Sequence, residues 1–597
     1  MSPTSPADAA GGLIGFAITI DGSAIDSSYQ VVSIDTWQAV NKVPRARIVL
    51  YDGSPAEASF PISNGASFLP GSAIDISVGY DGQLTSIFSG IVVRHGIEIP
   101  RNTASTLVID AADKAIKMTV ARKTVVSESV TDSDLISTLI GAYGLSSDVS
   151  STTTQHETVV QYDATDWDMM VTRAEMNGMV VTVDAGKVSV AAPDASQQAA
   201  LTIGYGDSIL ELRAEMDAVS QLPASGVKGY AWDAGTQAVL EGAGSATVSE
   251  TGNVTSTTLA DVCGVTSFAR LTGGLVEAAD LTGWASAELA RSKLAKVCGQ
   301  VRFQGSALAK AGGTIELAGL GDRFNGTVFV SAVHHDVRQG DWFTTVDFGL
   351  QPGWFAEHAA VAFAPAAGHL PPIRGLHTGV VQKIVEDPAG GFRVLVSLPL
   401  VRDDSVGVWA RLSTFYASKG VGAVFYPEIG DEVIVGFMNE DPRYPVVLGS
   451  VYSKTLAPAY TPDTENHIKG IVTKAKMELT FDETDKIVTI KTPGGHVITM
   501  DDKQGSIGIT DSNKNSMTLS KDGITIDSAS TIDITAKGDI SIKATGNLSL
   551  QATGNATCKG TQIELNADAK LSAQGNASAE LKSSGMVTVQ GSLVKIN

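Results

Sequence analysis

Two short motifs in this sequence resemble the start of known chemical sites, and each lacks a residue that the chemistry needs. His156-Glu157 begins the zinc-binding pattern H-E-x-x-H, but Val160 stands where the second histidine would complete the ligand pair. Gly319-Leu-Gly321 begins a dinucleotide-binding turn, but Phe324 replaces the third glycine. Neither stretch therefore predicts a metal or cofactor site.

The other histidines and the cysteines form no pattern typical of catalysis. His334 and His335 are adjacent on an expected strand, so their side chains point to opposite faces and do not clasp one metal. No G-x-S-x-G elbow and no phosphate-binding loop occurs in the chain. Cys263, Cys298 and Cys558 are an odd, scattered set, which is not a disulfide framework. We predict no catalytic residue, no cofactor, no metal site and no enzyme activity.

The most regular feature of the chain is a period of eight over residues 521–597. Apolar pairs separated by one residue recur at Ile524/Ile526, Ile532/Ile534, Ile540/Ile542, Leu548/Leu550 and, further on, Val587/Val589. Residues two apart on a strand face the same side, so each pair points inward while its neighbours face water. Gly538, Gly546 and Gly554 permit the corners between units. A fixed period of strand and corner predicts a β-helix or β-prism.

One eight-residue unit is too short to enclose a core, which leaves two arrangements. Three successive units of one chain make one coil of a solenoid, or three chains each supply one side of an intertwined needle. About ten units are present, so a solenoid would be a stub near the minimum number of repeats. We favour the trimer. Its predicted core residues are Ile524, Ile526, Ile532, Ile534, Ile540, Ile542, Leu548, Leu550, Val587 and Val589.

The apolar repeat continues to Ile596 without a polar cap. An open end of such a fold leaves apolar side chains and strand edges bare, so we expect another protein to cover it; fraying in water is the alternative. The predicted docking residues are Leu593, Val594, Lys595, Ile596 and Asn597.

Length and composition restrict the class of protein. A chain of 597 residues is too long for one core, and 43% apolar residues, 18% charged residues and 61 glycines are typical of a folded, turn-rich, β-leaning protein. A net charge of -21 argues against binding nucleic acid or an anionic membrane surface. No apolar run is long enough to cross a bilayer, and the N-terminus lacks the features of a signal peptide.

The local patterns predict mostly strands, with three helices. Gly15–Ile20 and Ala46–Tyr51 are among the early strands. Thr131 and Thr165 are typical N-caps of two helices, and a third helix is expected from about Trp284 to Val297. Together these patterns indicate two barrel-like β units with helices between them.

Five short strands are expected in the next eighty or so residues, which suits a small OB-type barrel. They are Thr378–Val385, Phe392–Leu398, Val408–Thr414, Glu432–Met438 and Val446–Tyr452.

This barrel segment carries the residues of a family resemblance. Glu428-Ile-Gly-Asp-Glu-Val433 and Pro445-Val-Val-Leu-Gly-Ser450 together resemble the OB domain of VgrG spike proteins and of the related phage central tail spike. Gln161–Asp168, with the E-x-x-G ending Glu175–Gly178, is similar to the family's Q-Y-x-x-S-D-x-D-F helix. Phe324–Gly326 and Val333–His335 are similar to its second-barrel strands, so the resemblance covers nearly the whole chain.

The resemblance implies a mainly β fold with tail-hub β-barrels, small helical insertions, an OB-fold collar and a C-terminal trimeric β-helix needle. The expected boundaries are 1–120 for the first hub barrel, 121–365 for the helices and second hub barrel, and 366–455 for the collar. Residues 456–520 are expected to form a neck and a less regular start of the needle, and 521–597 the octad-repeat needle.

The function implied is that of a homotrimeric puncturing spike and central hub of a contractile injection machine, whether an extracellular injection system, a type VI secretion system or a phage tail. The implied partners are a PAAR-type tip protein, the inner tube protein, baseplate proteins, an effector cargo and a mechanically punctured target membrane, with no nucleic acid. The protein would be assembled in the bacterial cytoplasm and released within an injection particle.

The alternative is a receptor-binding or glycan-degrading phage tail fibre, a class that also uses trimeric β-helices. Such a fibre needs exposed aromatic side chains along the needle. Residues 521–597 contain no Trp, Tyr or Phe, which argues against it.

Overall fold

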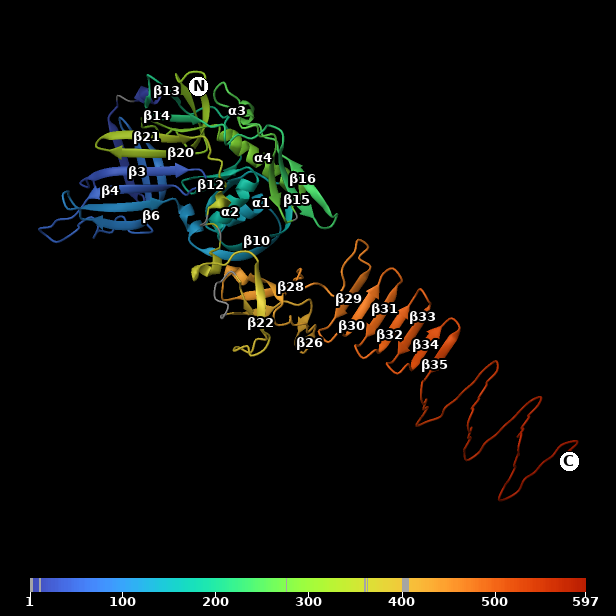
Figure 1. Ribbon diagram of the computed structural model, residues 1–597. Coiled ribbons are helices and arrows are strands. Elements are labelled where there is room, and N and C mark those ends of the chain that lie inside the picture. The colour runs from blue at the N-terminus through green and yellow to red at the C-terminus, as the bar shows by residue number, and fades with distance from the viewer. Residues whose placement is uncertain are drawn as a thin grey trace. The chain divides into compact units, whose positions relative to one another are not determined.

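The computed structural model describes residues 4–9, 12–274, 276–358, 361, 363–399 and 407–596. The chain divides into two compact units, Met1–Val451 and Tyr452–Asn597. Figure 1 labels their elements in chain order. Strands predominate in both units, as predicted for a mainly β fold.

A thirteen-stranded sheet is the main element of the larger unit. Its strands, in order across the sheet, are β14 (Ile209–Met216), β18 (Val297–Gln304), β21 (Asp341–Phe348), β20 (Gly326–Arg338), β3 (Val31–Ala39), β4 (Arg45–Tyr51), β7 (Thr106–Ala112), β6 (Gln83–Glu98), β5 (Ala73–Tyr80), β1 (Ile14–Ile20) and β2 (Ser23–Ala24). Two further strands of the sheet lie outside this linear order: β19 (Thr314–Ala318) pairs with β20, and β13 (Thr202–Gly204) pairs with β19.

Alternation of apolar and polar residues decides which face of this sheet is buried. On β4, Ala46, Ile48 and Leu50 are buried while Arg45 and Arg47 are exposed, the period-two pattern of a half-buried strand. The predicted strands Gly15–Ile20 and Ala46–Tyr51 are thus confirmed within a residue as β1 and β4.

The middle of the sheet joins segments that are far apart in the sequence. Strand β3 pairs with β20 in antiparallel register, so that Trp37 lies opposite His334 and Ile34 opposite Val337. The strands of residues 14–112 therefore belong to one continuous sheet with β14 (209–216) and with β18 to β21 (297–348). Local patterns do not predict this pairing.

Two of the predicted helices begin at the expected caps. Helix α1 (Asp132–Gly141) follows Thr131, whose side chain accepts a hydrogen bond from the backbone of Asp134. Helix α2 (Asp166–Met176) follows Thr165, which accepts in the same way from Asp168. A Thr or Ser oxygen satisfies a backbone N–H that the first helical turn leaves unpaired.

The third helix is longer than predicted at its start and shorter at its end. It is α4 (Ala278–Leu294), with Glu277 at the N-cap, so the expected bounds Trp284–Val297 are wrong at both ends. Alanines at its start favour helix, and Val297 instead begins β18. A short helix, α3 (Ser256–Val262), was not predicted.

Smaller elements complete the larger unit. They are the pair β8 (Arg122–Thr131) and β10 (Gln155–Thr165), the sheet β9 (Ser146–Val149), β12 (Lys187–Ala191) and β11 (Val180–Asp184), and the sheet β16 (Ala238–Ala243), β15 (Val227–Asp233) and β17 (Phe268–Thr272). Short 3-10 turns are η1 (Pro6–Ala9), η2 (Lys114–Thr119), η3 (Phe355–Glu357), η4 (Pro365–Gly368) and η5 (Met438–Glu440).

The predicted five-stranded barrel is present and closed. Around it run β22 (His377–Lys383), β23 (Val394–Ser397), β24 (Val408–Leu412), β28 (Pro445–Ser450) and β27 (Glu432–Phe437), with the hairpin β25 (Ala417–Ser418) and β26 (Val421–Gly422) outside the closure. Six valines and Ala410 fill its interior. Gly379 is required in β22, because a Cβ there would lie 2.4 Å from Cγ1 of Val396.

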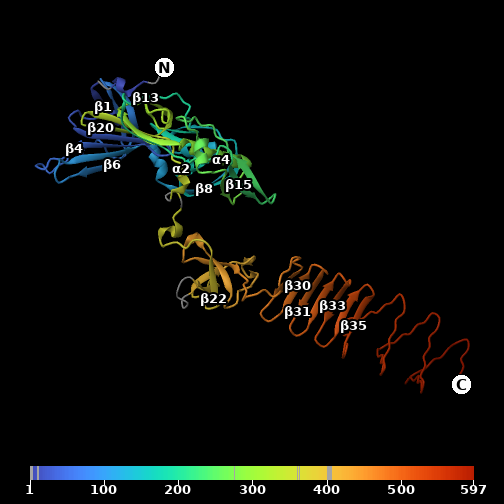
Figure 2. The same ribbon diagram turned by 45° about the horizontal axis from the view of Figure 1, so that its top comes forward.

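The smaller unit begins with a seven-stranded antiparallel sheet whose strands follow one another in chain order (Figure 1, Figure 2). The strands are β29 (Ile468–Val472), β30 (Glu478–Asp482), β31 (Ile487–Lys491), β32 (Val497–Asp501), β33 (Ser506–Thr510), β34 (Ser516–Ser520) and β35 (Gly523–Asp527). The stretch expected to be a less regular start of the needle is therefore a regular sheet. From residue 528 to 596 the described chain forms no strand, and it runs as segments that reverse direction repeatedly (Figure 1).

Candidate assembly surface

One face of the seven-stranded sheet is apolar on every strand. The register places Ile498 opposite Ile509, Ile509 opposite Met517, and Leu519 opposite Ile524. Partners in an antiparallel ladder point to the same face, so these pairs define one continuous apolar face. Its members are Ile471, Leu479, Phe481, Val488, Ile490, Ile498, Met500, Ile507, Ile509, Met517, Leu519, Ile524 and Ile526.

The opposite face has a row of small and polar residues along its middle. Thr480 pairs with Thr489, which pairs with Thr499, and Thr518 pairs with Thr525. Cross-strand threonine pairs stabilise a sheet whose outer face meets water. The sheet is therefore two-sided, with one face suited to solvent and one suited to burial.

The apolar face is nevertheless uncovered in the single chain. Ile490 is 46% exposed, Met500 47% and Ile509 46%. Figure 2 shows the strands of this sheet edge to edge with no second layer of the same unit against them.

The predicted needle core residues begin on the last strand of this sheet and follow it in the sequence. Ile524 and Ile526 lie on β35, the last strand of the sheet, and the other eight lie in the strand-free segment. All ten are between 47% and 85% exposed, the extremes being Val587 and Leu550. A single chain thus leaves the whole predicted core open to water. The segment forms no solenoid coil of its own within the described residues.

The predicted docking residues at 593–597 are also exposed. Leu593 is 74% exposed, Val594 48% and Ile596 91%, and Lys595 is exposed too. Asn597 lies outside the described residues.

The sequence prediction missed the apolar residues between 471 and 519, although a signal for them exists. Pairs separated by one residue occur at Leu479/Phe481, Val488/Ile490, Ile498/Met500, Ile507/Ile509 and Met517/Leu519. They recur every nine or ten residues instead of every eight, because the turns here are longer. A search for the pair at a variable spacing would have found them.

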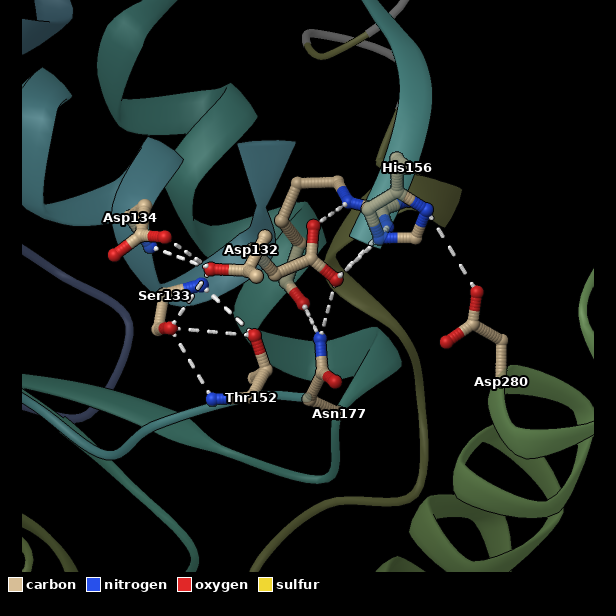
Figure 3. A network of polar contacts seen from close by, with 9 residues as sticks. Asp132, Ser133, Asp134, Thr152, His156, Asn177 and Asp280 are labelled. Atoms are coloured by element: carbon tan, nitrogen blue, oxygen red, sulfur yellow. Dashed lines mark hydrogen bonds and ion pairs between the residues drawn. The ribbon is translucent and has the colours of Figure 1, made fainter. Parts of the chain in front are cut away.

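The histidine of the incomplete zinc motif lies in a polar network between four elements (Figure 3). His156 on β10 places Nε2 3.3 Å from Oδ2 of Asp132 and Nδ1 3.8 Å from Oδ2 of Asp280 on α4. Arg173 on α2 donates from Nε to Asp132 Oδ1 at 2.6 Å, and Asn177 Nδ2 donates to Asp132 Oδ2 at 2.8 Å. The arrangement connects β10, α1, α2 and α4.

The charge state of Asp132 follows from these contacts. Burial acts to raise the pKa of Asp132, but hydrogen bonds and charge from Arg173, with Asn177 and His156, outweigh burial and lower it. An ionised carboxylate held by a bidentate guanidinium is a structural cross-link, and here it connects α1 to α2.

The other histidine pair behaves as the strand pattern predicted. His334 stacks on Trp37 with ring centroids 5.0 Å apart, whereas His335 is buried and its Nδ1 lies 3.0 Å from Oγ1 of Thr344. Burial lowers the pKa of His335 to about 3. The two rings therefore lie on opposite faces of β20.

The residues that the structure describes contain neither a metal-binding cluster nor a membrane-spanning helix. No group of three or more His, Cys, Asp or Glu side chains in that part of the chain is placed to hold a metal ion. No helix in the same residues is long and apolar enough to cross a membrane.

Two segments of the chain match known protein families. Residues 377–452, which contain the closed barrel, match the family described as "Type VI secretion system/phage-baseplate injector OB domain". Residues 10–339, more than half of the chain, match the family described as "Alg8 N-terminal domain". The chain belongs to this Alg8 N-terminal domain family, and the matches of its barrel and of the VgrG relatives confirm the predicted resemblance to VgrG and phage central tail spike proteins.

Individual relatives are similar over shorter stretches. The type VI secretion system spike protein VgrG1c of Pseudomonas aeruginosa is 36% identical over 105 residues, 16% of this chain and 14% of that protein. The spike protein VgrG1b of the same organism is 31% identical over 149 residues, 23% of this chain and 18% of that protein. The chain thus spans less than a fifth of each relative. The 43 kDa tail protein of prophage MuSo2 from Shewanella oneidensis has a TM-score of 0.41 at 10% identity, over 57% of this chain and 98% of that one.

Proposed function

We propose that this protein is the puncturing spike and central hub of a contractile injection machine and works as a homotrimer. In this proposal residues 1–120 and 121–365 form the hub, 366–455 the collar, 456–520 the neck and start of the needle, and 521–597 the octad-repeat needle. The similarity to VgrG spike proteins supports the role, and the bare apolar face of the C-terminal unit supports the trimer.

The observation that carries the proposal is the bare apolar face of the seven-stranded sheet. Its last strand carries the first octad pair, Ile524 and Ile526, and the sequence repeats such pairs in the residues that follow. Burying a side chain the size of Ile contributes roughly 1.5 to 3 kcal/mol, and a single chain gains little of this. A partner surface with the same spacing is required along the whole length, and identical chains supply it in register.

Three chains fit this surface better than one chain. Each octad offers one strand-length side with a single apolar pair, so a closed core needs further sides from elsewhere. Three copies that wind together bring three such pairs to each level. Because the core then depends on all three chains, needle formation and trimer formation are one event.

The protein acts mechanically in this proposal and carries out no reaction. Sheath contraction drives the needle into a target membrane, the hub receives the inner tube and baseplate proteins, and an effector cargo travels with the spike. A PAAR-type tip protein docks on Leu593, Val594, Lys595, Ile596 and Asn597. The exposed apolar side chains of Leu593 and Ile596 support this docking site.

Light scattering on the purified full-length chain tests the proposal directly. We expect a native mass of three times 61.9 kDa. A monomer, or a dimer with two sheets packed face to face, would contradict the intertwined trimer and remove the physical basis of the needle.

A further inference from the structure

A groove that neither the sequence nor the proposed function accounts for crosses the exposed face of the large sheet. Two adjoining hollows of about 540 Å³ and about 380 Å³ share Trp37, Arg45 and Ile116 as lining residues, so they form one continuous depression. The floor is made by β3, β4, β7 and β6, with η2 along one side. We call this depression the Trp37 groove.

The indole at the centre of the groove is held rigidly. Trp37 is 43% exposed, and its ring is nearly parallel to that of His334, at an interplanar angle of 5°. His334 Nε2 in turn lies 3.1 Å from Oδ1 of Asp35, which fixes the imidazole. A rigid aromatic side chain loses little conformational entropy when a partner covers it. Val93, 42% exposed, extends the apolar floor.

The rim of the groove is basic, although the chain as a whole is strongly acidic. Lys42, Arg45, Arg47 and Arg94 line it, and Asp110 is the single carboxylate among the lining residues. Arg47 Nε donates to Asp110 Oδ1 at 2.7 Å, and Arg94 lies 3.7 Å from Asp110 Oδ2 with its side chain 77% exposed. This leaves four cations against one anion in a chain of net charge -21.

Two of these cations have no anionic partner in the part of the chain that the structure describes. Lys42 and Arg45 are exposed, and neither forms an ion pair with any residue that the structure describes. Exposed, unpaired charges contribute little to stability, so folding alone does not account for their position around an open indole. Arginine beside an aromatic residue is the composition typical of residues that dominate binding energy at protein interfaces.

We propose that the Trp37 groove binds an acidic segment of a separate protein. An apolar side chain of that segment packs on the indole of Trp37, and flanking carboxylates bind Arg45, Arg94 and Lys42, the arginines by two-pronged hydrogen bonds. Nucleic acid fits the groove less well, because one aromatic ring offers no series of stacking positions and the net charge repels phosphates. The inference goes beyond the proposed function and does not depend on the needle.

Peptide selection on the intact, full-length protein tests the inference. A displayed library of random dodecapeptides is selected against it, and enriched peptides are measured by fluorescence anisotropy. We expect enriched peptides to carry Asp or Glu around an aromatic or aliphatic residue. Arg45→Glu and Trp37→Ala should each weaken their binding at least about tenfold. Arg45→Gln, which adds no repulsive charge, should weaken it less.

The matched control is Arg213→Glu, which removes an arginine of the same sheet whose side chain is 83% exposed and does not line the groove. Binding should be unchanged in this variant. The inference is wrong if enriched peptides are not acidic, if they bind the two Arg45 variants as tightly as the wild type, or if a single-stranded oligonucleotide displaces them. It is also wrong if Arg45→Glu changes the native mass, because a second copy of the chain would then occupy the groove. The native mass is measured separately from the peptide affinity. A failure of the trimer proposal can therefore be distinguished from a failure of the peptide-binding inference.

Discussion

At the scale of single residues, some ionisable side chains of the larger unit are buried and contact neighbouring elements. His335 is buried on β20 beside Trp342, with ring centroids 5.9 Å apart, and burial lowers its pKa to about 3. Glu175, also buried, accepts hydrogen bonds from Asn41, Arg291 and the backbone of Phe355. Such groups fix how the elements of the larger unit pack against one another.

His335 predicts a pH dependence with a definite sign. The unfolded chain binds a proton below about pH 6.5, while the folded chain does not until about pH 3, so unfolding is favoured as pH falls between these values. Between pH 7.5 and pH 5.5 this difference in proton binding lowers the free energy of unfolding by about 1.4 kcal/mol. Thermal unfolding followed by tryptophan fluorescence measures it in the larger unit alone, since residues 452–597 contain no Trp.

His335→Gln is the variant that isolates this effect. It keeps a polar group near Thr344 but removes the titration, so its melting temperature should fall less than that of the wild type over the same pH interval. An equal fall in both proteins would show that other groups control the acid response.

At the scale of elements, close approach of α4 to the sheet of β15 and β16 depends on glycines. A Cβ on Gly242 would lie 2.4 Å from the backbone nitrogen of Thr282, and one on Gly229 would lie 2.9 Å from the carbonyl oxygen of Leu281. The helix therefore packs directly on the strand backbones. Residues with a side chain at these positions would force the two elements apart.

We predict that Gly242→Ala destabilises the larger unit by about 1 to 3 kcal/mol, because an inserted methyl group has no space. Gly283→Ala, inside α4, is the matched control. Its Cβ would find its nearest neighbour, the carbonyl oxygen of Met176, at 4.0 Å. That change should stabilise the helix by up to about 1 kcal/mol. Denaturant unfolding of both variants checks the pair, and equal effects would contradict the packing argument.

At the scale of the whole molecule, assembly is expected to depend on the apolar pairs of the C-terminal unit. Each apolar pair alternates with residues that are expected to face water. A charged residue introduced at an apolar position should therefore disrupt the trimer, whereas the same residue at the neighbouring position should not. The single chain leaves both kinds of position exposed, and only the assembled protein distinguishes them.

Ile540→Asp should prevent trimer formation, because the assembled core would bury three carboxylates at one level. Light scattering should give a mass near 61.9 kDa for this variant. Ser541→Asp, one residue further on and on the opposite side of the segment, should leave the trimer intact. A folded Ile540→Asp trimer of unchanged mass would contradict the proposed core.

Removal of Val594–Asn597 should abolish binding of a PAAR-type tip protein and spare the trimer, because the remaining pairs still form the core. A pull-down with the purified tip protein, together with light scattering, measures both properties. Undiminished capture of the tip protein by the shortened chain would place its docking site elsewhere.

The sequence by itself determined the features that depend only on the spacing of nearby residues. The N-caps at Thr131 and Thr165 and the five strands of the barrel need only neighbouring residues, and the structure has them where they were expected. The octad pairs are equally local. Their spacing is explicit in the sequence, although their burial stays a prediction because it depends on other chains.

Features that depend on distant residues were decided only by the tertiary structure. The pairing of β3 with β20 brings Trp37 beside His334, and with them the groove, from segments that no local period relates. The start of α4 and the regular sheet before β35 were likewise missed, because the patterns there lack a strong cap or a constant period. Periodicity predicts which face of a helix or strand is apolar. Packing over the whole chain determines which other element covers that face.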